Sequence, residues 1–278
     1  MAIEMFIRFE DSSGTVRYGE ISGAGEVADL PGAKVGVLAG DPFTGLSKTG
    51  EKFEVKKVLC PLESTPIIIC IGLNYRQHAT EANLTVPKYP VVFTKPADAL
   101  AGPYDNIAIH PDAQSMLDYE GELTVVIGKD AKDVSEADAL EYVLGYTAGN
   151  DVSARNFQLP DVSGGQFCFA KSFDGFAPIG PAILTTAAID DPQKLEYTTK
   201  VNGEVRQKTE TGDMIWSVRQ IIAHLSTGTT LRKGTVIMTG TPSGVGFFMK
   251  SNGFLHDGDM VEVNIKGIGS IANKMKFL

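Results

Sequence analysis

Residues 118–129 read DYEGELTVVIGK and join two glutamates to a strongly apolar strand candidate. Side chains alternate between the two faces of an extended chain, so Glu120 and Glu122 are expected to point the same way. Asp151, at the end of the next strand candidate, can supply a third oxygen ligand. Three carboxylates with open positions for water suit Mg²⁺, Mn²⁺ or Ca²⁺, whereas zinc prefers nitrogen and sulfur ligands. The alternative from spacing alone is that the two glutamates lie on a solvated strand edge. Asp118 shares their face and could be a fourth ligand, but a surface position is the better interpretation for it.

The rest of the chain offers more strand candidates than helix candidates. Apolar or alternating runs predict strands at residues 67–71, 123–128, 143–149 and 235–239. Ser135 is a plausible cap for a short helix over 135–142, and Ser217 for an amphipathic helix over 218–225. Because these helices are scattered and do not alternate regularly with strands, the sequence predicts a mixed, β-rich α/β fold.

The first 62 residues are predicted to form a small β-rich module, followed by a large catalytic domain over 63–278. Residues 5–9 and 16–21 have strand character on either side of a turn signal, and Gly and Pro then interrupt residues 30–50. Nothing in this module combines the residue types that chemistry needs, so we expect a packing or oligomer-scaffold role. In the larger domain, Asn-Gly at 202–203 predicts a hairpin turn.

The composition limits the partners that the chain can bind. Its 278 residues include 34 acidic and 25 basic side chains, which gives a formal net charge of −9 and a sequence pI near 5.0. Binding to nucleic acid or to an anionic membrane needs a surplus of Lys and Arg, so neither partner is expected. The longest aliphatic run, residues 67–71, is far shorter than the ~20 residues that cross a bilayer.

The cysteines and the N-terminal residues bear on location. Cys60, Cys70 and Cys168 form no C-x-x-C pair, which favours reduced thiols over a disulfide framework. Glu4 and Glu10 stand where a secretory or mitochondrial leader would be cationic. A cytoplasmic location is therefore predicted, with a mitochondrial one left open.

His78 and Glu81 form a second candidate cluster, within GLNYRQHATE (72–81). Three residues apart on a helical turn, the carboxylate can hold the imidazole in one tautomer and raise its basicity. The pair is a candidate general base for activating water; the alternative is a surface salt bridge. The chain has no G-x-S-x-G, P-loop or H-E-x-x-H motif, so the corresponding chemistries lack support.

A third group of polar residues follows Asp151. Arg155 lies one helical turn beyond it, and both Arg155 and Gln158 could reach an anionic substrate. Lys171 follows the apolar residues 167–170, which have strand character, and a lysine so placed either reaches back to solvent or holds a negative group.

Together these segments resemble the fumarylacetoacetate hydrolase superfamily. The matching pieces occur in the family's order from about residue 66 onward. They are GLNYRQHATE (72–81), FTKP (93–96), DYEGELTVVIGK (118–129), GNDVSARNFQ (149–158), AKSFDGFAPIGP (170–181), VNGE (201–204) and MTGTPSGVG (238–246). The chain is most similar to the short fumarylacetoacetate hydrolase domain-containing proteins and to bacterial homoprotocatechuate-pathway isomerase/decarboxylases.

The resemblance implies a β-sandwich roll with a small N-terminal β-rich domain, usually assembled as a homodimer. It implies Mg²⁺ or Mn²⁺, with Ca²⁺ a further option in crystals, bound by Glu120, Glu122 and Asp151. It also implies a small 2-oxo acid or β-dicarbonyl acid as substrate. The full-length hydrolase has an additional metal-binding aspartate where this chain has Ile71, so fumarylacetoacetate itself is not the expected substrate.

The same resemblance assigns roles to the polar residues. His78 and Glu81 match the water-activating dyad, Lys171 is the third catalytic residue, and residues 79–90 would form a lid. The residues expected to bind substrate are Arg155, Gln158, Thr241 and Tyr75.

Three functions follow as hypotheses. The leading one is metal-dependent hydrolysis of a C–C bond in an acylpyruvate-like acid, with His78–Glu81 activating water. The alternative is a keto–enol tautomerase or decarboxylase acting on oxaloacetate or another 2-oxo acid. A non-catalytic, metabolite-binding family member is the third, and it is disfavoured because every expected ligand and dyad position is filled.

Overall fold

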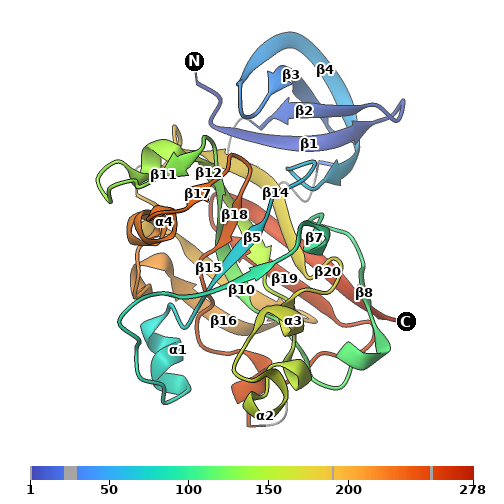
Figure 1. The fold of residues 1–278 in the computed structure, drawn as a ribbon. Coiled ribbons are helices and arrows are strands. Elements are labelled where there is room, and N and C mark those ends of the chain that lie inside the picture. Colours follow the sequence, from blue (N-terminus) through green and yellow to red (C-terminus); the bar gives the residue numbers. More distant parts are fainter. Residues whose placement is uncertain (1, 22–29, 190, 251–252) are drawn as a thin grey trace.

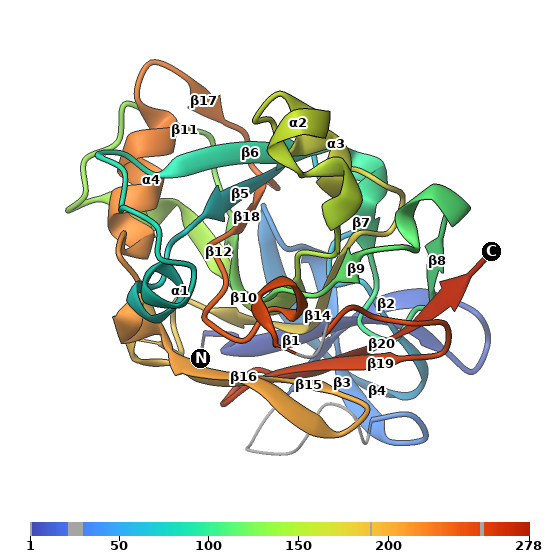
Figure 2. The same cartoon turned by 90° about the horizontal axis from the view of Figure 1, so that it is seen from below.

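The computed structural model describes residues 2–21, 30–189, 191–250 and 253–278. A large mixed sheet runs through the molecule in the order β2-β3-β4-β1-β14-β12-β10-β18-β5-β6, with β7 paired to β14. A second sheet, in the order β16-β15-β19-β20-β8, packs against it (Figures 1 and 2). This β-rich, two-sheet architecture confirms the predicted fold class.

The strands of the large sheet are β1 (Met5–Asp11), β2 (Val16–Glu20), β3 (Lys34–Asp41), β4 (Gly45–Leu59), β5 (Ile68–Gly72), β6 (Val91–Lys95), β7 (Leu100–Ala101), β10 (Gly121–Ile127), β12 (Val143–Asn150), β14 (Ala177–Thr185) and β18 (Val236–Met238). The second sheet contains β8 (Ile107–Ile109), β15 (Glu196–Val201), β16 (Glu204–Glu210), β19 (Met260–Ile265) and β20 (Gly269–Phe277). Two short ladders pair β9 (Leu117–Asp118) with β13 (Ser153–Ala154) and β11 (Ala131–Lys132) with β17 (Thr230–Leu231). The α-helices are α1 (Arg76–Glu81), α2 (Pro160–Ser163), α3 (Cys168–Lys171) and α4 (Val218–Ser226).

The central strands are the apolar runs that the sequence predicts. Every residue of β10 is buried, and β5 is buried except at its last residue. Strand β5 lies between β18, to which it is parallel, and β6, to which it is antiparallel. Strands covered on both faces need apolar side chains on both, which explains why β5 shows no alternation.

The N-terminal module contains four strands, where the sequence predicted two. Strands β3 and β4 form a long hairpin within residues 34–59, and the expected interruption by Gly and Pro over 30–50 is wrong there. Most side chains of β4 are exposed and polar, so its sequence has no apolar run to mark it as a strand. Strand β1 joins the module to β14, and the large sheet continues across the boundary. The division at residue 62 stays a prediction.

Two local predictions had different outcomes. Ser217 caps α4 through a capping box with Gln220, as expected from the sequence. The helix predicted over 135–142 is only a 3₁₀ turn at Ala139–Tyr142, although the Ser135 hydroxyl accepts from the Asp138 backbone N–H as a helix cap does. No helix in the described ranges is long and apolar enough to cross a membrane.

Helices α1, α2 and α3 lie at the end of the molecule opposite to β1–β4 (Figure 1). Helix α1 follows β5, and helices α2 and α3 follow β13, one after the other. The residues singled out in the sequence analysis gather at this end.

Candidate functional site

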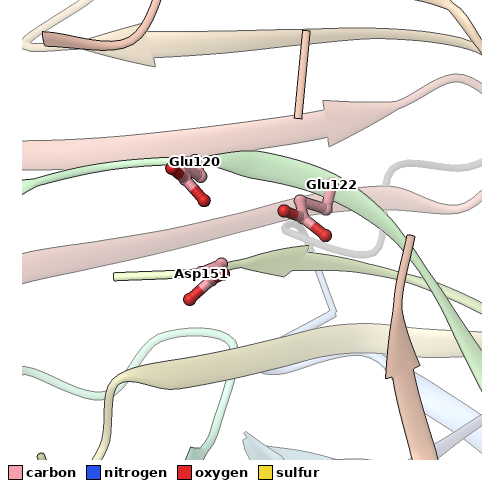
Figure 3. A group of neighbouring side chains, drawn as sticks. All are labelled: Glu120, Glu122 and Asp151. Atoms are coloured by element: carbon pink, nitrogen blue, oxygen red, sulfur yellow. The ribbon is translucent and has the colours of Figure 1, made fainter. Parts of the chain in front are cut away.

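Glu120, Glu122 and Asp151 form a buried acidic cluster, in which one oxygen of each lies within 4.8 Å of the others (Figure 3). Pairing of β10 with β12 brings them together, because Gly121 faces Asn150 in this ladder. Asp151 also donates its backbone N–H to the Glu120 carbonyl at 2.8 Å. The strand edge is therefore not solvated, contrary to the alternative interpretation from spacing.

Three buried cations surround the acidic cluster. The Lys171 Nζ lies 2.7 Å from Glu120 Oε2 and 2.9 Å from Asp151 Oδ2. The Lys95 Nζ lies 2.6 Å from Asp151 Oδ1. Arg155 Nη2 donates to Glu120 Oε1 at 2.5 Å. Glu122 has no ion pair within the described residues, and it accepts a hydrogen bond from a backbone N–H.

The two glutamates have opposite pKa shifts as a result. Burial alone would raise the pKa of Glu120, but the charges of Lys171 and Arg155 outweigh it and lower the pKa to about 2. For Glu122, burial and the neighbouring charges of Asp151 and Glu120 raise the pKa well above its ordinary value. A further cation beside Glu122 would stabilise its charged form.

Asp118 is not a surface residue, so that interpretation is wrong. Its carboxylate is fully buried, accepts hydrogen bonds from the backbone of Gly246 and Phe247, and pairs with Arg155 Nε at 2.8 Å. Arg155 thus bridges Asp118 and Glu120, and its Nη1 also donates to Gln158 Oε1. Its guanidinium fixes the position of the acidic cluster from one side.

Lys171 ends a short helix, α3, and not the strand expected over 167–170. Its side chain is 1% exposed, so it does not reach back to solvent. Burial alone would lower the pKa of Lys171, but the charges of Asp151 and Glu120 raise it, so the ammonium stays protonated.

Lys95 is the residue that sequence reasoning missed. It ends β6, is 1% exposed, and donates to the carbonyls of Val152 and Phe176 as well as pairing with Asp151. The sequence signal was available: VVFTK puts a lysine on the same strand face as Phe93, where a burial pattern demands a partner of opposite charge.

Residues 240–244 link the acidic cluster to the dyad. The Gly240 N–H donates to Glu122 Oε2 at 2.7 Å, and the Gly244 N–H lies 3.1 and 3.2 Å from the two oxygens of Glu81. Gly240 has φ +102°, and a side chain there would collide with Asn74 at 2.6 Å. Only glycine fits at position 240, which explains why MTGTPSGVG (238–246) has glycine there.

His78 and Glu81 lie on α1 as predicted, with Nδ1 and Oε2 3.2 Å apart. His78 is 9% exposed, and its ring packs edge-on against Phe248 at 5.6 Å between centroids. The carboxylate holds Nδ1 and leaves Nε2 for chemistry.

A cavity of about 450 Å³ brings most of these side chains together. Its polar lining residues are Glu120, His78, Arg155, Gln158, Lys171, Thr241 and Thr85. The Thr241 hydroxyl donates to the Gly121 carbonyl at 3.0 Å and accepts from Gln207 at 2.8 Å. Its single proton is therefore already in use, and donation to a substrate carboxylate requires the hydroxyl to rotate.

Tyr75 lies away from this cavity. It is fully buried and packs edge-on against Tyr197 at 6.1 Å between ring centroids. Burial raises the pKa of its phenol, which stays neutral. This placement differs from the expected contact with substrate.

The structure thus combines a β-rich fold with buried acidic residues beside a cavity that cationic groups and a histidine also line. Residues 67–276 match the family model described as fumarylacetoacetate (FAA) hydrolase C-terminal, and residues 5–59 match Rv2993c-like, N-terminal. The chain belongs to the fumarylacetoacetate hydrolase family. Members of this superfamily are enzymes, typically dependent on a divalent metal.

Named relatives include hydrolase-domain proteins and tautomerases. The chain is 47% identical over 229 residues to "Fumarylacetoacetate hydrolase domain-containing protein 2 homolog" of Dictyostelium discoideum, covering 79% of this chain and 74% of the relative. It is 43% identical over 217 residues to "Oxaloacetate tautomerase FAHD2A, mitochondrial" of Bos taurus, covering 78% and 68%. The 2-hydroxyhepta-2,4-diene-1,7-dioate isomerase from Mycobacterium marinum has a similar structure, with a TM-score of 0.83, 36% identity and coverage of 99% and 98%.

Proposed function

We propose that this chain interconverts the keto and enol forms of a 2-oxo acid, with a divalent cation held by Glu120, Glu122 and Asp151. The observation that supports it is the burial of these carboxylates beside a cavity that also contains Lys171, Arg155 and His78. The names of its relatives, oxaloacetate tautomerase among them, support the same reaction class.

The reaction moves one proton between C3 and the oxygen on C2. Lys171 and Arg155 place positive charge beside the point where negative charge develops on that oxygen. His78, held at Nδ1 by Glu81, takes the proton from C3 and delivers it to the oxygen on C2, and in the reverse direction it moves the proton from that oxygen back to C3. Gln158 and Thr241 orient the carboxylate of the substrate at the polar end of the cavity.

The donor set fits a hard divalent cation, because all three ligands are carboxylate oxygens and Glu122 has no cation of its own. Such a cation supplies Lewis-acid stabilisation of the oxo-acid oxygens. Glu120 and Asp151, which hold the Lys171 ammonium at 2.7 and 2.9 Å, would be ligands of that cation as well.

Mg²⁺ or Mn²⁺ is expected to stabilise the metal-free protein by about 2.7 kcal/mol at a hundredfold excess over the dissociation constant. Urea unfolding with and without the ion measures this. In Glu122→Gln, which mimics the neutral carboxyl, the protein should fold but the gain should shrink. Equal stability of the wild type in Mn²⁺ and in EDTA would remove the metal from the proposal.

The proposal itself is tested with the enol forms of several 2-oxo acids, oxaloacetate among them, and Mg²⁺, by following the loss of enol absorbance. Accelerated decay without release of pyruvate supports tautomerisation, and release of CO₂ with pyruvate indicates decarboxylation. No acceleration with any 2-oxo acid would refute the proposal.

Hydrolysis of an acylpyruvate is the second candidate, and the geometry of the His78–Glu81 dyad favours it. The imidazole lines the cavity and is oriented by a carboxylate, as activation of a water molecule requires. Formation of pyruvate and a free carboxylic acid from an acylpyruvate would support this reaction.

His78→Ala is expected to lower the rate of either reaction by ~10²-fold or more, the scale of general-base catalysis. Steady-state kinetics on enol-oxaloacetate and an acylpyruvate measure the loss. His256→Ala, which changes an exposed histidine, is the matched control and should retain full activity. A fully active His78→Ala would leave the dyad without a role.

A homodimer remains a prediction, as does a cytoplasmic location. The mitochondrial relatives keep a mitochondrial location open. A small oxo acid is the proposed partner.

A further inference from the structure

The cavity has two chemically different ends. Its polar groups gather around Glu120, while other parts of the wall are apolar, including Val91, Phe93 and Phe167. The volume of about 450 Å³ falls in the range that holds drug-sized ligands and is generous for a four-carbon acid. The apolar end therefore has room for a part of the substrate that the reaction does not change.

Strand β6 connects the two ends. Val91, Phe93 and Lys95 alternate onto one face, with successive members about 7 Å apart. A methyl group added to Gly72 would lie 3.3 Å from Val91 and 3.7 Å from Phe93, so both side chains pack over Gly72. Along this face of β6, Lys95 contacts Asp151, Phe93 presents an aromatic ring, and Val91 presents an aliphatic side chain.

Aromatic rings mark the transition. The Lys171 Nζ lies 5.1 Å from the centroid of the Phe93 ring, and Phe167 packs edge-on against Phe93 at 5.8 Å. A ligand group that extends from Lys171 past Phe93 contacts the apolar side chains of Val91 and Phe167 and no longer contacts the charged groups. Burial of apolar carbons against such surface is favourable, by about 0.8 kcal/mol for each methylene group.

Charge at the site limits the substrate to one carboxylate. Lys171 and Arg155 are the Lys and Arg side chains that line the cavity in the described ranges, and both already pair with Glu120. The apolar end offers no further lysine or arginine from those ranges to a second carboxylate. A carboxylate held against apolar carbon atoms loses hydration and gains no cationic partner, so a distal one opposes binding.

We infer that the site selects 2-oxo acids that carry one carboxylate and an uncharged, apolar substituent of several carbons, seated along Val91, Phe93 and Phe167. The inference rests on the proposed function, which puts the oxo-acid group at the polar end. The inferred substrate has one carboxylate, whereas the compounds in the names of two relatives, oxaloacetate and 2-hydroxyhepta-2,4-diene-1,7-dioate, have two.

Binding of matched acids tests the inference without relying on turnover. Calorimetry in Mn²⁺ compares pyruvate, 2-oxooctanoate and 2-oxooctanedioate, of which the last two differ only at the far end. We expect 2-oxooctanoate to bind at least ~10-fold more tightly than either of the others, on the scale of burying several methylene groups.

Two variants of β6 sharpen the comparison. Val91→Lys puts an ammonium on the cavity face and should reverse the preference between the two eight-carbon acids. Val92→Lys is the matched control, because Val92 is 44% exposed on the other face and should leave the preference unchanged.

The outcomes separate this inference from the proposed function. Equal or tighter binding of 2-oxooctanedioate to the wild type overturns the inference, while binding of pyruvate leaves the proposed function intact. Binding of none of the three acids overturns both. The wild-type comparison stands even where Val91→Lys fails to fold.

Discussion

Glu120→Ala should lower kcat/KM for 2-oxo acids by at least ~10³-fold, the upper part of the range for losing one preorganised electrostatic group. The expected loss is large because Glu120 has three roles. It is a proposed metal ligand, and its two oxygens hold Lys171 at 2.7 Å and Arg155 at 2.5 Å. Alanine removes the proposed metal ligand. It also removes the carboxylate that holds Lys171 and Arg155, so these cations are no longer positioned toward a substrate oxygen.

Loss of enol absorbance measures turnover in this variant, and calorimetry with Mn²⁺ measures its metal affinity. Glu120→Gln keeps the shape of the side chain and removes only its charge, so it separates packing from electrostatics. Glu141→Ala, which truncates an exposed carboxylate, controls for the preparation. Turnover within tenfold of the wild type in Glu120→Ala would contradict the assigned site.

Lys95→Met should lower the free energy of unfolding of the metal-free protein by about 3–5 kcal/mol, the range for breaking a buried ion pair on one side. Methionine fills a similar volume, but Asp151 then loses one of its two ammonium partners. The carbonyls of Val152 and Phe176 lose their contacts with Lys95 as well. Urea denaturation gives the change in free energy.

The double variant Lys95→Met/Asp151→Asn should recover part of this loss, because the uncompensated charge is gone. Lys56→Met is the control: its ion pair with Glu10 is exposed, and its loss should cost less than about 1 kcal/mol. A fall of under about 1 kcal/mol for Lys95→Met would show that Lys171 alone compensates Asp151.

The sequence predicts the centre of this fold better than its edge. Strands β5, β10 and β12 have apolar runs because both of their faces are covered, so their existence follows from hydrophobicity alone. Strand β4 is long but mostly exposed, and its stability comes from pairing with β1 and β3. Pairing with partner strands leaves no hydrophobic pattern in the sequence of β4 itself.

The same limit applies to the site. Glu120, Glu122 and Asp151 could be grouped from the sequence because each lies next to a strand end that the apolar pattern reveals. Asp118 could not be placed, since its burial depends on Arg155, 37 positions away. For Lys95, the segment VVFTK indicates a buried lysine that needs an acidic partner, but it does not identify Asp151 as that partner.

The order of strands has a consequence for how this protein folds. Strand β5 pairs with β18, more than 160 residues later, and β1 pairs with β14. Non-local pairings of this kind make folding slow, because the chain must close large loops before the contacts repay the lost entropy. A ribosome-bound chain that ends before residue 236 cannot complete the central sheet. The backbone amide that holds Glu122 is also added late in synthesis, so the acidic cluster becomes complete only when the last part of the chain has emerged.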